Sequence, residues 1–315
     1  MKYWIGIDIG GTKIAAASIS EDFEVLYRTE VRTPVESRSG PAVLGAVDAI
    51  IEKIGSLSPG HLQGIGVGSG GQIDSVRGVV LSATDVIPGW SGTDIAGHLA
   101  RVHGVRAAAD NDVNVLALCE STLGAGRAKG TVVYLSLGTG VGGALVIDGQ
   151  VHHGAHWCGG EFGHILLSID PQARADLGGA RGTLEAYASG GGLAANYQEL
   201  AGECSATVTG IEIGKAAQLN PHSLEAEAVR KTGEYLGYGI VSLLNALDPD
   251  LVVVGGGLAS LGDLLLDPAR KVVRERALPG AAHCPIVPSS LGPDAPVIGA
   301  ALLIMQQQRK AFTPL

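Results

Sequence analysis

The chain has 315 residues, of which 46% are hydrophobic and 17% are charged, and its formal net charge is −9. This composition is typical of a well-buried globular protein that is long enough for two domains, and it excludes a disordered chain. The acidic balance argues against non-specific nucleic-acid binding, because phosphate backbones select basic surfaces.

Cysteine usage and the N-terminal residues indicate the compartment. The four cysteines show no paired spacing, so we interpret them as reduced structural thiols. Met1 leads directly into a predicted strand, and glycines and charges interrupt every apolar stretch before it reaches membrane-spanning length. These features predict a cytoplasmic protein without a membrane partner. The cysteines are Cys119, Cys158, Cys204 and Cys284.

The first part of the chain predicts the order β-β-β-α-β-α-β-α, which is an α/β layer architecture. It opens with a hairpin in which apolar residues alternate around Asp8 and a Gly10-Gly11-Thr12 turn follows at once. Later elements follow from apolar periodicity and from a capping sequence that ends at Asp94. The predicted elements after the hairpin are strand 25–33, helix 42–54, strand 65–68, hairpin 73–81, a helix from Asp94 to about His103, strand 105–109 and helix 113–123.

The second part repeats this order. A strand, a Gly138-Thr139-Gly140 turn and a second strand echo the opening hairpin. Two α/β halves, each beginning with a glycine-tipped hairpin, predict duplicated domains around a cleft. The later predicted elements are a loop at 152–164, a helical region that begins at Leu184–Ala188, a helix at 225–247, a strand at 251–254 and a final helix at 297–305.

Three glycine turns are candidates for phosphate binding. Each follows an apolar strand, and glycine lets backbone N–H groups approach an anion without a Cβ in the way. Lys13 adds a positive charge to the first turn, and Asp8 would lie near a metal ion that accompanies the phosphate. The alternative is that a chain with 48 glycines simply contains many turns. The candidate residues are Gly10, Gly11, Thr12 and Lys13, then Gly138, Thr139 and Gly140, then Gly255, Gly256 and Gly257.

Asn111-Asp112 lies where a predicted strand gives way to a helix. Ligands of α/β folds bind beyond the carboxyl ends of strands, and an aspartate there can accept a proton from a hydroxyl nucleophile. The alternative is that Asp110 or Asp112 only caps the helix. Position alone does not separate these two interpretations.

A glycine-rich loop carries Glu161 and His164, whose side chains are suited to hydrogen-bonding the hydroxyls of a polyol. The alternative is a surface loop of small residues, which the neighbouring Trp157 and Phe162 argue against. Glu185 is a further polar candidate, although taken alone it is typical of a solvated helix charge.

Together these motifs resemble the ROK family of bacterial glucokinases and related sugar kinases, and the resemblance spans nearly the whole chain. The family has the two-lobed actin/hexokinase/Hsp70-like ATPase fold. The resemblance rests on six motifs, which are residues 8–13 (DIGGTK), 111–114 (NDVN), 137–143 (LGTGVGG), 160–164 (GEFGH), 184–190 (LEAYASG) and 253–257 (VVGGG).

The resemblance implies a role for each motif. Asp112 would be the general base for a sugar hydroxyl that attacks the γ-phosphate of ATP, and Asp8 would lie near Mg²⁺, through water. The first two glycine turns would hold the phosphates, and residues 255–257 would flank the adenosine. The sugar would contact Gly70, Gly71, Asn111, Glu161, His164 and Glu185.

One departure from the family concerns zinc. ROK kinases usually carry a Cys-x-Cys-Gly-x-x-Gly-Cys-x-Glu segment whose cysteines, with the histidine of the Glu-x-Gly-His motif, bind a structural zinc ion. In this chain Asp176, Gly178 and Thr183 stand at the three cysteine positions, while Glu185 is kept. Thiolates hold such a closed site, so we predict no structural zinc. His164 must then be oriented by another partner.

The other departures lie in loops near the expected sugar. Val86 stands where the family often has an asparagine that reaches a sugar hydroxyl, and Asp85 precedes it. Residues 69–72 (SGGQ) replace the usual Pro-Gly-Pro. These changes leave the identity of the sugar open, and an acidic group there would favour an amino sugar.

The leading prediction is a glucokinase-type enzyme that transfers phosphate from ATP to the 6-hydroxyl of a hexose. The alternatives are a kinase of an amino or N-acetyl hexose (glucosamine, kanosamine or N-acetylmannosamine) and a non-catalytic sugar-sensing protein. The early position of Asp8 leaves no room for the helix-turn-helix of the family's repressors, so we expect no nucleic-acid partner. We expect an N-terminal lobe at 1–115 completed by the helix at 297–315, a C-terminal lobe at 116–296, a homodimer built on that larger lobe, and closure of the lobes on sugar binding.

Overall fold

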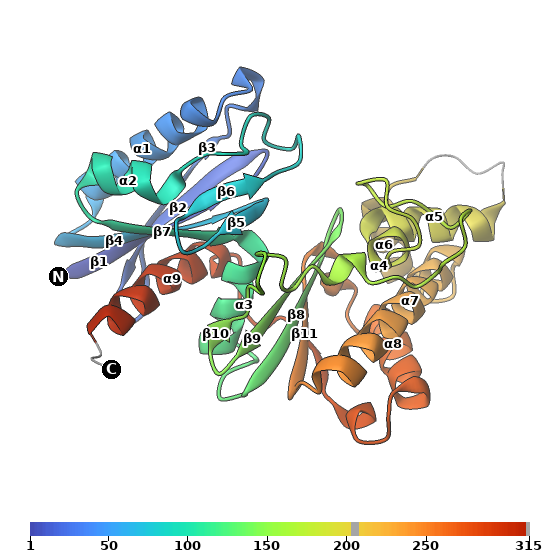
Figure 1. Cartoon of the computed structure of the whole chain (residues 1–315). Coiled ribbons are helices and arrows are strands. Elements are labelled where there is room, and N and C mark those ends of the chain that lie inside the picture. The colour runs from blue at the N-terminus through green and yellow to red at the C-terminus, as the bar shows by residue number, and fades with distance from the viewer. Residues whose placement is uncertain (203–207, 313–315) are drawn as a thin grey trace. The chain divides into compact units, whose positions relative to one another are not determined.

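A computed structural model describes residues 1–202 and 208–312, so Cys204 lies outside the described residues (Figure 1). The chain divides into two compact units. Unit 1 comprises Met1–Gly124, His153–Cys158 and the chain from Leu291 onward, and unit 2 comprises Ala125–His152 and Gly159–Ser290.

Unit 1 is built on a five-stranded mixed sheet of order β3-β2-β1-β4-β7. The first three strands form an antiparallel meander, while β1, β4 and β7 run parallel. The predicted opening hairpin is confirmed, since Ile9 pairs with Ile14 and Gly10 N donates to Lys13 O at 3.0 Å across the turn. The strands are β1 (Lys2–Ile9), β2 (Lys13–Ser20), β3 (Val25–Arg32), β4 (His61–Ser69) and β7 (Arg106–Asn111).

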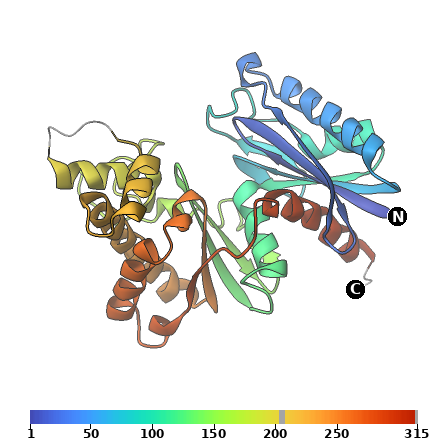
Figure 2. The ribbon, with the colours of Figure 1, turned by 180° about the vertical axis from the view of Figure 1, so that it is seen from behind.

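Helices cover both faces of this sheet (Figures 1 and 2). On one face, α1 (Gly40–Leu57) packs its apolar stripe on Ile5, Ile7 and other buried strand residues. On the other face lie α3 (Asp112–Leu123) and α9 (Ala295–Phe312). The sheet carries glycines there, because a Cβ on Gly6 or Gly66 would lie 1.8 Å or 1.7 Å from a carbonyl oxygen of α9. Strand alternation therefore explains the Ile-Gly-Ile pattern of β1.

The remaining elements of unit 1 connect these layers. The capping segment predicted at 91–94 is confirmed, with Asp94 as the cap, because its carboxylate accepts a hydrogen bond from Gly97 N at 2.8 Å at the start of α2 (Ile95–His103). A small hairpin consists of β5 (Gln72–Asp74) and β6 (Val79–Ser82).

Unit 2 contains a second five-stranded sheet, of order β10-β9-β8-β11-β12. Its first strands, β8 (Thr131–Leu137) and β9 (Val141–Ile147), form the second predicted hairpin, and β11 (Leu251–Gly255) pairs parallel to β8. The short strands β10 (Gln150–Val151) and β12 (Ile286–Pro288) form the edges. This repeats the strand-turn-strand opening of unit 1.

The helices of unit 2 gather around α7 (Leu224–Leu247), which packs on α8 (Asp263–Arg276) and whose inward residues join the core of the sheet (Figure 1). A helical region is predicted to begin at Leu184–Ala188, and α4 (Leu184–Ala188), followed by α5 (Gly190–Ala201), confirms it. Two helices were not predicted, namely α6 (Gly210–Leu219) and α8. Pro268 is a helix-breaking residue inside α8, whereas α6 begins with a capping box of Thr209 and Glu212.

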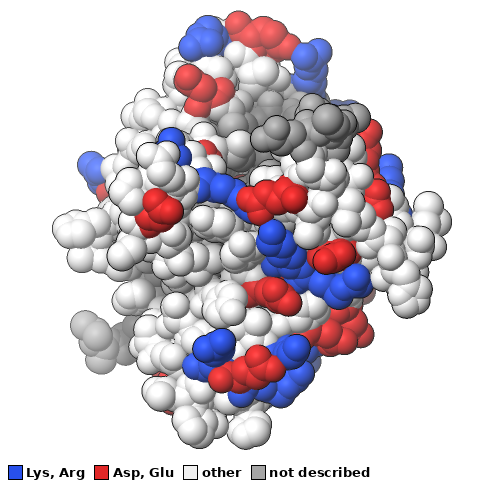
Figure 3. Space-filling view, turned by 90° about the vertical axis from the view of Figure 1, so that its right-hand side faces the viewer, with Lys and Arg blue, Asp and Glu red and all other residues white. Residues whose placement is uncertain are grey.

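The described part of the chain contains no helix that is long and apolar enough to cross a membrane. Figure 3 shows one face of the molecule, on which acidic and basic side chains are interspersed. Cys119, Cys158 and Cys284 are free thiols.

Candidate active site

In unit 1, polar residues gather where the parallel strands β1, β4 and β7 end. Asp8 lies in register with Gly68, and Gly68 with Asp110, so the two aspartates flank a glycine in one row across the sheet. The next row ends in Ser69 and Asn111. This is the edge at which open α/β sheets bind ligands, and it explains why distant sequence motifs meet here.

Asp112 is the first residue of α3, directly beyond β7. The helix cap is Asn111, whose Oδ1 accepts from Val113 N at 2.8 Å and from Asn114 N at 3.4 Å. The alternative in which Asp110 or Asp112 is the cap is therefore wrong. Asn111 Nδ2 donates to Gly71 O at 3.0 Å, which brings together two residues predicted to contact the sugar.

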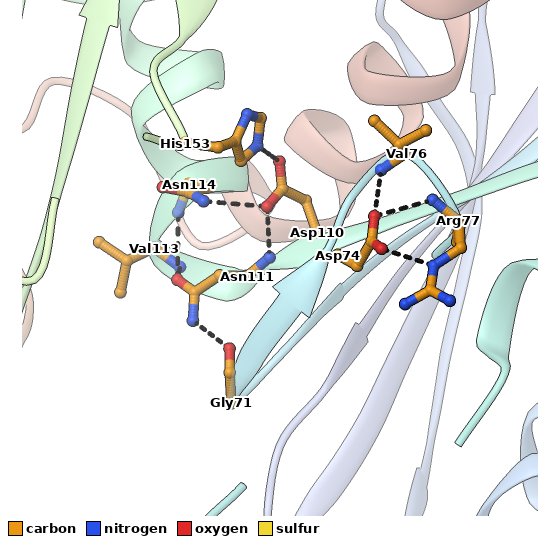
Figure 4. A network of polar contacts seen from close by, with 9 residues as sticks. All are labelled: Gly71, Asp74, Val76, Arg77, Asp110, Asn111, Val113, Asn114 and His153. Atoms are coloured by element: carbon orange, nitrogen blue, oxygen red, sulfur yellow. Dashed lines mark hydrogen bonds and ion pairs between the residues drawn. The ribbon is translucent and has the colours of Figure 1, made fainter. Parts of the chain in front are cut away.

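Asp110 anchors this corner (Figure 4). Its side chain is 1% exposed, and Oδ1 accepts from Asn111 N at 2.7 Å and from Asn114 Nδ2 at 2.9 Å. Oδ2 lies 2.7 Å from His153 Nε2. Sequence reasoning missed His153 as a site residue, because its segment joins unit 1 only through the fold. The network holds the start of α3, and with it Asp112, against β7.

The electrostatics of Asp8 and Asp112 single them out. Burial, the negative charge of Asp112 and, in the opposite sense, the positive charges of Lys13 and Arg28 together raise the pKa of Asp8 to about 6. Burial also raises the pKa of Asp112, although the N–H of Val113 donates to its Oδ1 at 2.9 Å and favours the charged form. Buried carboxylates with raised pKa values are typical of sites that hold a cation or move a proton.

The first glycine turn is braced by a residue that sequence reasoning missed. Thr33 is fully buried; its hydroxyl donates to Gly10 O at 2.6 Å, and its N–H donates to Thr12 O at 3.1 Å. Lys13 lies 2.9 Å from Glu30, and both side chains are about half exposed. Exposed ion pairs of this kind are weak, so Lys13 can exchange Glu30 for an anionic ligand at little cost.

The loops that depart from the family lie beside these elements. Gly71 has φ +109°, and a Cβ on it would lie 2.7 Å from Ser82 O, so the loop needs glycine there. Val86 is exposed, and its side chain lies close to Gly11, where an added Cβ would meet it at 2.3 Å. Val86 thus places an apolar group beside the glycine turn.

In unit 2, the second glycine turn is held by Glu185. Glu185 Oε2 accepts from Val141 N at 2.9 Å, and a Cβ on Gly140 would lie 2.4 Å from the same oxygen. Gly190 N donates to Gly138 O at 2.8 Å. The start of α4 and the start of α5 therefore fix the turn, and the fold brings Glu185 together with Gly138–Gly140.

The loop that carries Glu161 and His164 lies tightly on β9. A Cβ on Gly163 would lie 2.1 Å from Val141 O, and Gly160 has φ +97° and lies close to Ala144. Glycine is required because the loop backbone contacts the strand directly. His164 ends the 3₁₀ helix Phe162–His164, and its side chain is 59% exposed.

The third glycine turn has a partly structural explanation. A Cβ on Gly255 would lie 2.1 Å from the Tyr134 hydroxyl, and a Cβ on Gly256, which has φ +82°, would lie 2.4 Å from Leu137 O. Only Gly257, which opens the 3₁₀ helix Gly257–Leu261, faces open space. Close packing on β8 therefore accounts for two of the three glycines.

The residues of unit 1 fit a magnesium ion that accompanies phosphate. Mg²⁺ takes oxygen ligands and is commonly bound by one or two carboxylates together with substrate phosphates and water. Asp8 supplies such oxygens, and within the described residues no side-chain hydrogen bond occupies its carboxyl group.

The residues at the family's zinc positions do not fit a structural zinc ion. They are a carboxylate, a glycine and a hydroxyl, whereas structural zinc sites are built from thiolates and imidazoles. Across 1–202 and 208–312, no group of three or more His, Cys, Asp or Glu side chains is arranged to hold a metal ion.

Two α/β units, each with a glycine-tipped hairpin, and two interacting carboxylates near the carboxyl ends of parallel strands are features expected of a nucleotide-dependent phosphotransferase. Comparisons with known proteins specify the family. The ROK family model matches residues 4–307. The sequence is 31% identical over 320 residues to a glucokinase of Halalkalibacterium halodurans, and the alignment covers 98% of this chain and 96% of the relative.

Two further similarities extend this result. The sequence is 31% identical over 309 residues to an N-acetyl-D-glucosamine kinase of Vibrio cholerae, covering 95% of this chain and 99% of the relative. The structure is similar to a ROK family glucokinase from Streptomyces griseus in complex with glucose and AMPPNP, with a TM-score of 0.78, 29% identity, and coverage of 96% of this chain and 99% of that one. The chain belongs to the ROK family, and it is a sugar kinase with the actin/hexokinase/Hsp70-like ATPase fold.

Proposed function

We propose that this protein transfers the γ-phosphate of ATP to the primary 6-hydroxyl of a hexose, with Asp112 as the general base. The observation that carries the proposal is the position of Asp112, which starts α3 beyond the end of β7, where the Asp110 network holds it. Phosphoryl transfer asks mainly for positioning and charge stabilisation, together with one group that accepts the proton.

The proposed reaction needs one proton transfer by the protein. Asp112 takes the hydroxyl proton as the sugar oxygen forms a bond to the γ-phosphorus, and the bond from that phosphorus to the β–γ bridging oxygen breaks to release ADP. Burial raises the pKa of Asp112 and so makes its carboxylate a stronger base than an ordinary exposed aspartate. The capped end of α3 keeps the carboxylate at a fixed place.

The phosphate groups are assigned to the glycine turns. We assign Gly10–Lys13 and Gly138–Gly140 to the phosphates and Gly255–Gly257 to the adenosine, with the open position of Gly257 as the strongest support in the third turn. Asp8 would hold Mg²⁺ through water, which leaves Asp112 free to accept the sugar proton. When bound, this ion supplies positive charge to the phosphate oxygens.

The sugar is assigned to polar groups of both units. Asn111 and Gly71 already share a hydrogen bond, and Gly70 has no atom within 4 Å of an added Cβ, which leaves room for a ring beside it. In unit 2, Glu161, His164 and Glu185 are the proposed partners of the sugar hydroxyls. Their carboxylate and imidazole groups are acceptors suited to hydroxyl donors.

An amino or N-acetyl hexose is the second candidate substrate. The supporting observation is the loop at Asp85 and Val86, where an apolar side chain replaces the amide usual in the family and leaves an exposed carboxylate next to it. The similarity to an N-acetyl-D-glucosamine kinase agrees with such a substrate. We also propose that the enzyme works in the cytoplasm and that it is a homodimer. The molar mass of the purified protein from light scattering tests the homodimer.

The experiment is a coupled ADP-release assay with MgATP across a panel of glucose, mannose, glucosamine, kanosamine, N-acetylglucosamine and N-acetylmannosamine. We expect one or two sugars to stimulate ADP release strongly, with glucose first. A higher kcat/KM for an amino or N-acetyl sugar than for glucose would make the second candidate the preferred substrate. Absence of stimulation by every sugar would refute the kinase proposal.

A further inference from the structure

We propose that Asp176 is a positioning residue that holds His164 and the Glu185 helix in place, as a metal-free replacement for the zinc ion expected in the family. This inference rests on the proposed function, because it concerns two of the residues assigned to the sugar. It is carried by a set of contacts inside unit 2.

The Asp176 carboxylate is the centre of these contacts. Its side chain is fully shielded from solvent, which is uncommon for an aspartate and requires partners. Oδ1 accepts from Ala180 N at 2.9 Å, and Oδ2 accepts from the Thr183 hydroxyl at 2.8 Å. The same Oδ2 lies 3.8 Å from His164 Nδ1.

The contact with His164 is electrostatic, because 3.8 Å between Oδ2 and Nδ1 is longer than a hydrogen bond, and we infer that it biases the orientation of the imidazole. A carboxylate near Nδ1 favours the tautomer with its proton on that nitrogen, so Nε2 remains as an acceptor. Since the His164 side chain is 59% exposed, Nε2 can accept from a sugar hydroxyl while Nδ1 stays near Asp176. A bound metal would orient the ring in a comparable way, and here a carboxylate does so.

The contact with Thr183 reaches Glu185. Thr183 is the N-cap of α4, and its Oγ1 accepts from Ala186 N at 3.3 Å while it donates to Asp176. One hydroxyl thus links the buried carboxylate to the helix that carries Glu185. Asp176 therefore supports both proposed sugar partners, His164 directly and Glu185 through Thr183.

The surrounding loop is closed by backbone pairing as well. Leu184 N donates to Ile165 O at 2.7 Å, next to an isolated bridge between Leu166 and Thr183. A second bridge joins Ala175 to Arg181 around the Asp176 turn. The 165–183 loop is thus tied down next to His164 by hydrogen bonds, in the segment where the family uses zinc.

The test uses the full-length protein and four variants, Asp176→Asn, Thr183→Val, Thr183→Ser and Asp170→Asn. Asp176→Asn replaces one acceptor oxygen of the carboxylate with an NH₂ group and removes the negative charge. Thr183→Val removes the hydroxyl but keeps nearly the same side-chain shape. We expect both to raise the sugar KM about tenfold, which corresponds to the loss of one partly buried hydrogen bond, and to change the KM for ATP much less. Thr183→Ser restores the hydroxyl and should return the sugar KM to the wild-type value.

Asp170→Asn is the matched control, because Asp170 lies in the same loop but is exposed, and its carboxylate accepts from Gln172 N at 2.8 Å without reaching Thr183 or His164. We expect it to leave both KM values unchanged. Thermal unfolding monitored by circular dichroism separates lost folding from lost positioning. The zinc content of wild-type protein prepared with excess zinc and then dialysed is the second readout, and we expect none to be retained.

The outcomes separate this inference from the proposed function. An active wild-type enzyme whose sugar KM is unchanged in Asp176→Asn and Thr183→Val overturns the positioning role alone. Retention of one zinc ion per chain by the wild type overturns the metal-free replacement. A wild-type protein that releases no ADP with any sugar overturns the kinase proposal, and this inference with it.

Discussion

Replacing Asp110 by alanine removes the acceptor at the centre of the network beside Asp112 (Figure 4). The side chain is 1% exposed, so water barely reaches the groups that it satisfies. The N–H of Asn111 and the Nδ2 of Asn114 lose their partner, and His153 loses a 2.7 Å contact. We expect the start of α3 to be strongly weakened.

The magnitude follows from the two orphaned donors. A buried donor without a partner costs about 1–3 kcal/mol, and two donors near the lower end of that range give about 2 kcal/mol of unfolding free energy. Loss of the His153 contact adds little, because this side chain is 22% exposed and can turn toward water. The Asp110→Ala variant should therefore unfold at a clearly lower urea concentration than the wild type.

Tryptophan fluorescence is a suitable assay, because all three tryptophans belong to unit 1. They are Trp4, Trp90 and Trp157, and the first two are buried. Urea titration of the full chain then reports the unfolding of this unit. The control is Asp22→Ala in the exposed turn between β2 and β3, which should change the unfolding free energy by less than about 0.5 kcal/mol. A loss below about 1 kcal/mol in Asp110→Ala would refute the reasoning about the orphaned donors.

Two further predictions concern Asp8 and the sheet glycines. The pKa of Asp8 rises from 3.8 to about 6 on folding, so the wild type loses stability as the pH rises through that window, while Asp8→Asn does not. The unfolding free energy of Asp8→Asn minus that of the wild type should therefore be larger at about pH 7 than at about pH 4.5. The same difference at both pH values would contradict the raised pKa of Asp8. Gly66→Ala puts a Cβ 1.7 Å from Ala300 O and should lower the unfolding free energy by about 2–3 kcal/mol. Its control, Gly45→Ala in the interior of α1, meets no atom within 4 Å and should raise stability by about 0.5–1 kcal/mol; equal urea midpoints for the two variants would contradict the steric argument.

Much of the fold could be predicted from the sequence, because its apolar patterns are local. Both glycine-tipped hairpins, the capping segment that ends at Asp94 and the helical region that begins at Leu184–Ala188 are found where they were predicted. Of the helices that were missed, α8 contradicts local propensity at Pro268, and packing against α7 overrides that propensity. The start of α6 carries a local signal that sequence reasoning overlooked, the capping box of Thr209 and Glu212.

The candidate site was predictable in its motifs and much less so in its contacts. The sequence marked Asn111 and Asp112, but the assignment of Asn111 as the cap depends on helix geometry. His153 lies 43 residues after Asp110, so their contact required the fold. Likewise, the missing cysteines indicated that zinc ligands were lost, whereas the shielded Asp176–Thr183 pair appears only when the loop is folded.

The most direct test of the account is the effect of Asp112→Asn on turnover and on sugar binding. We expect kcat for sugar-dependent ADP release to fall about 10³-fold, within the range for loss of a general base, while the sugar Kd from calorimetry changes less than about threefold. Asp22→Asn serves as the matched control for the same chemical change at an exposed site, and it should keep wild-type kcat. A kcat for Asp112→Asn within about tenfold of the wild-type value would contradict the role of Asp112 as the base.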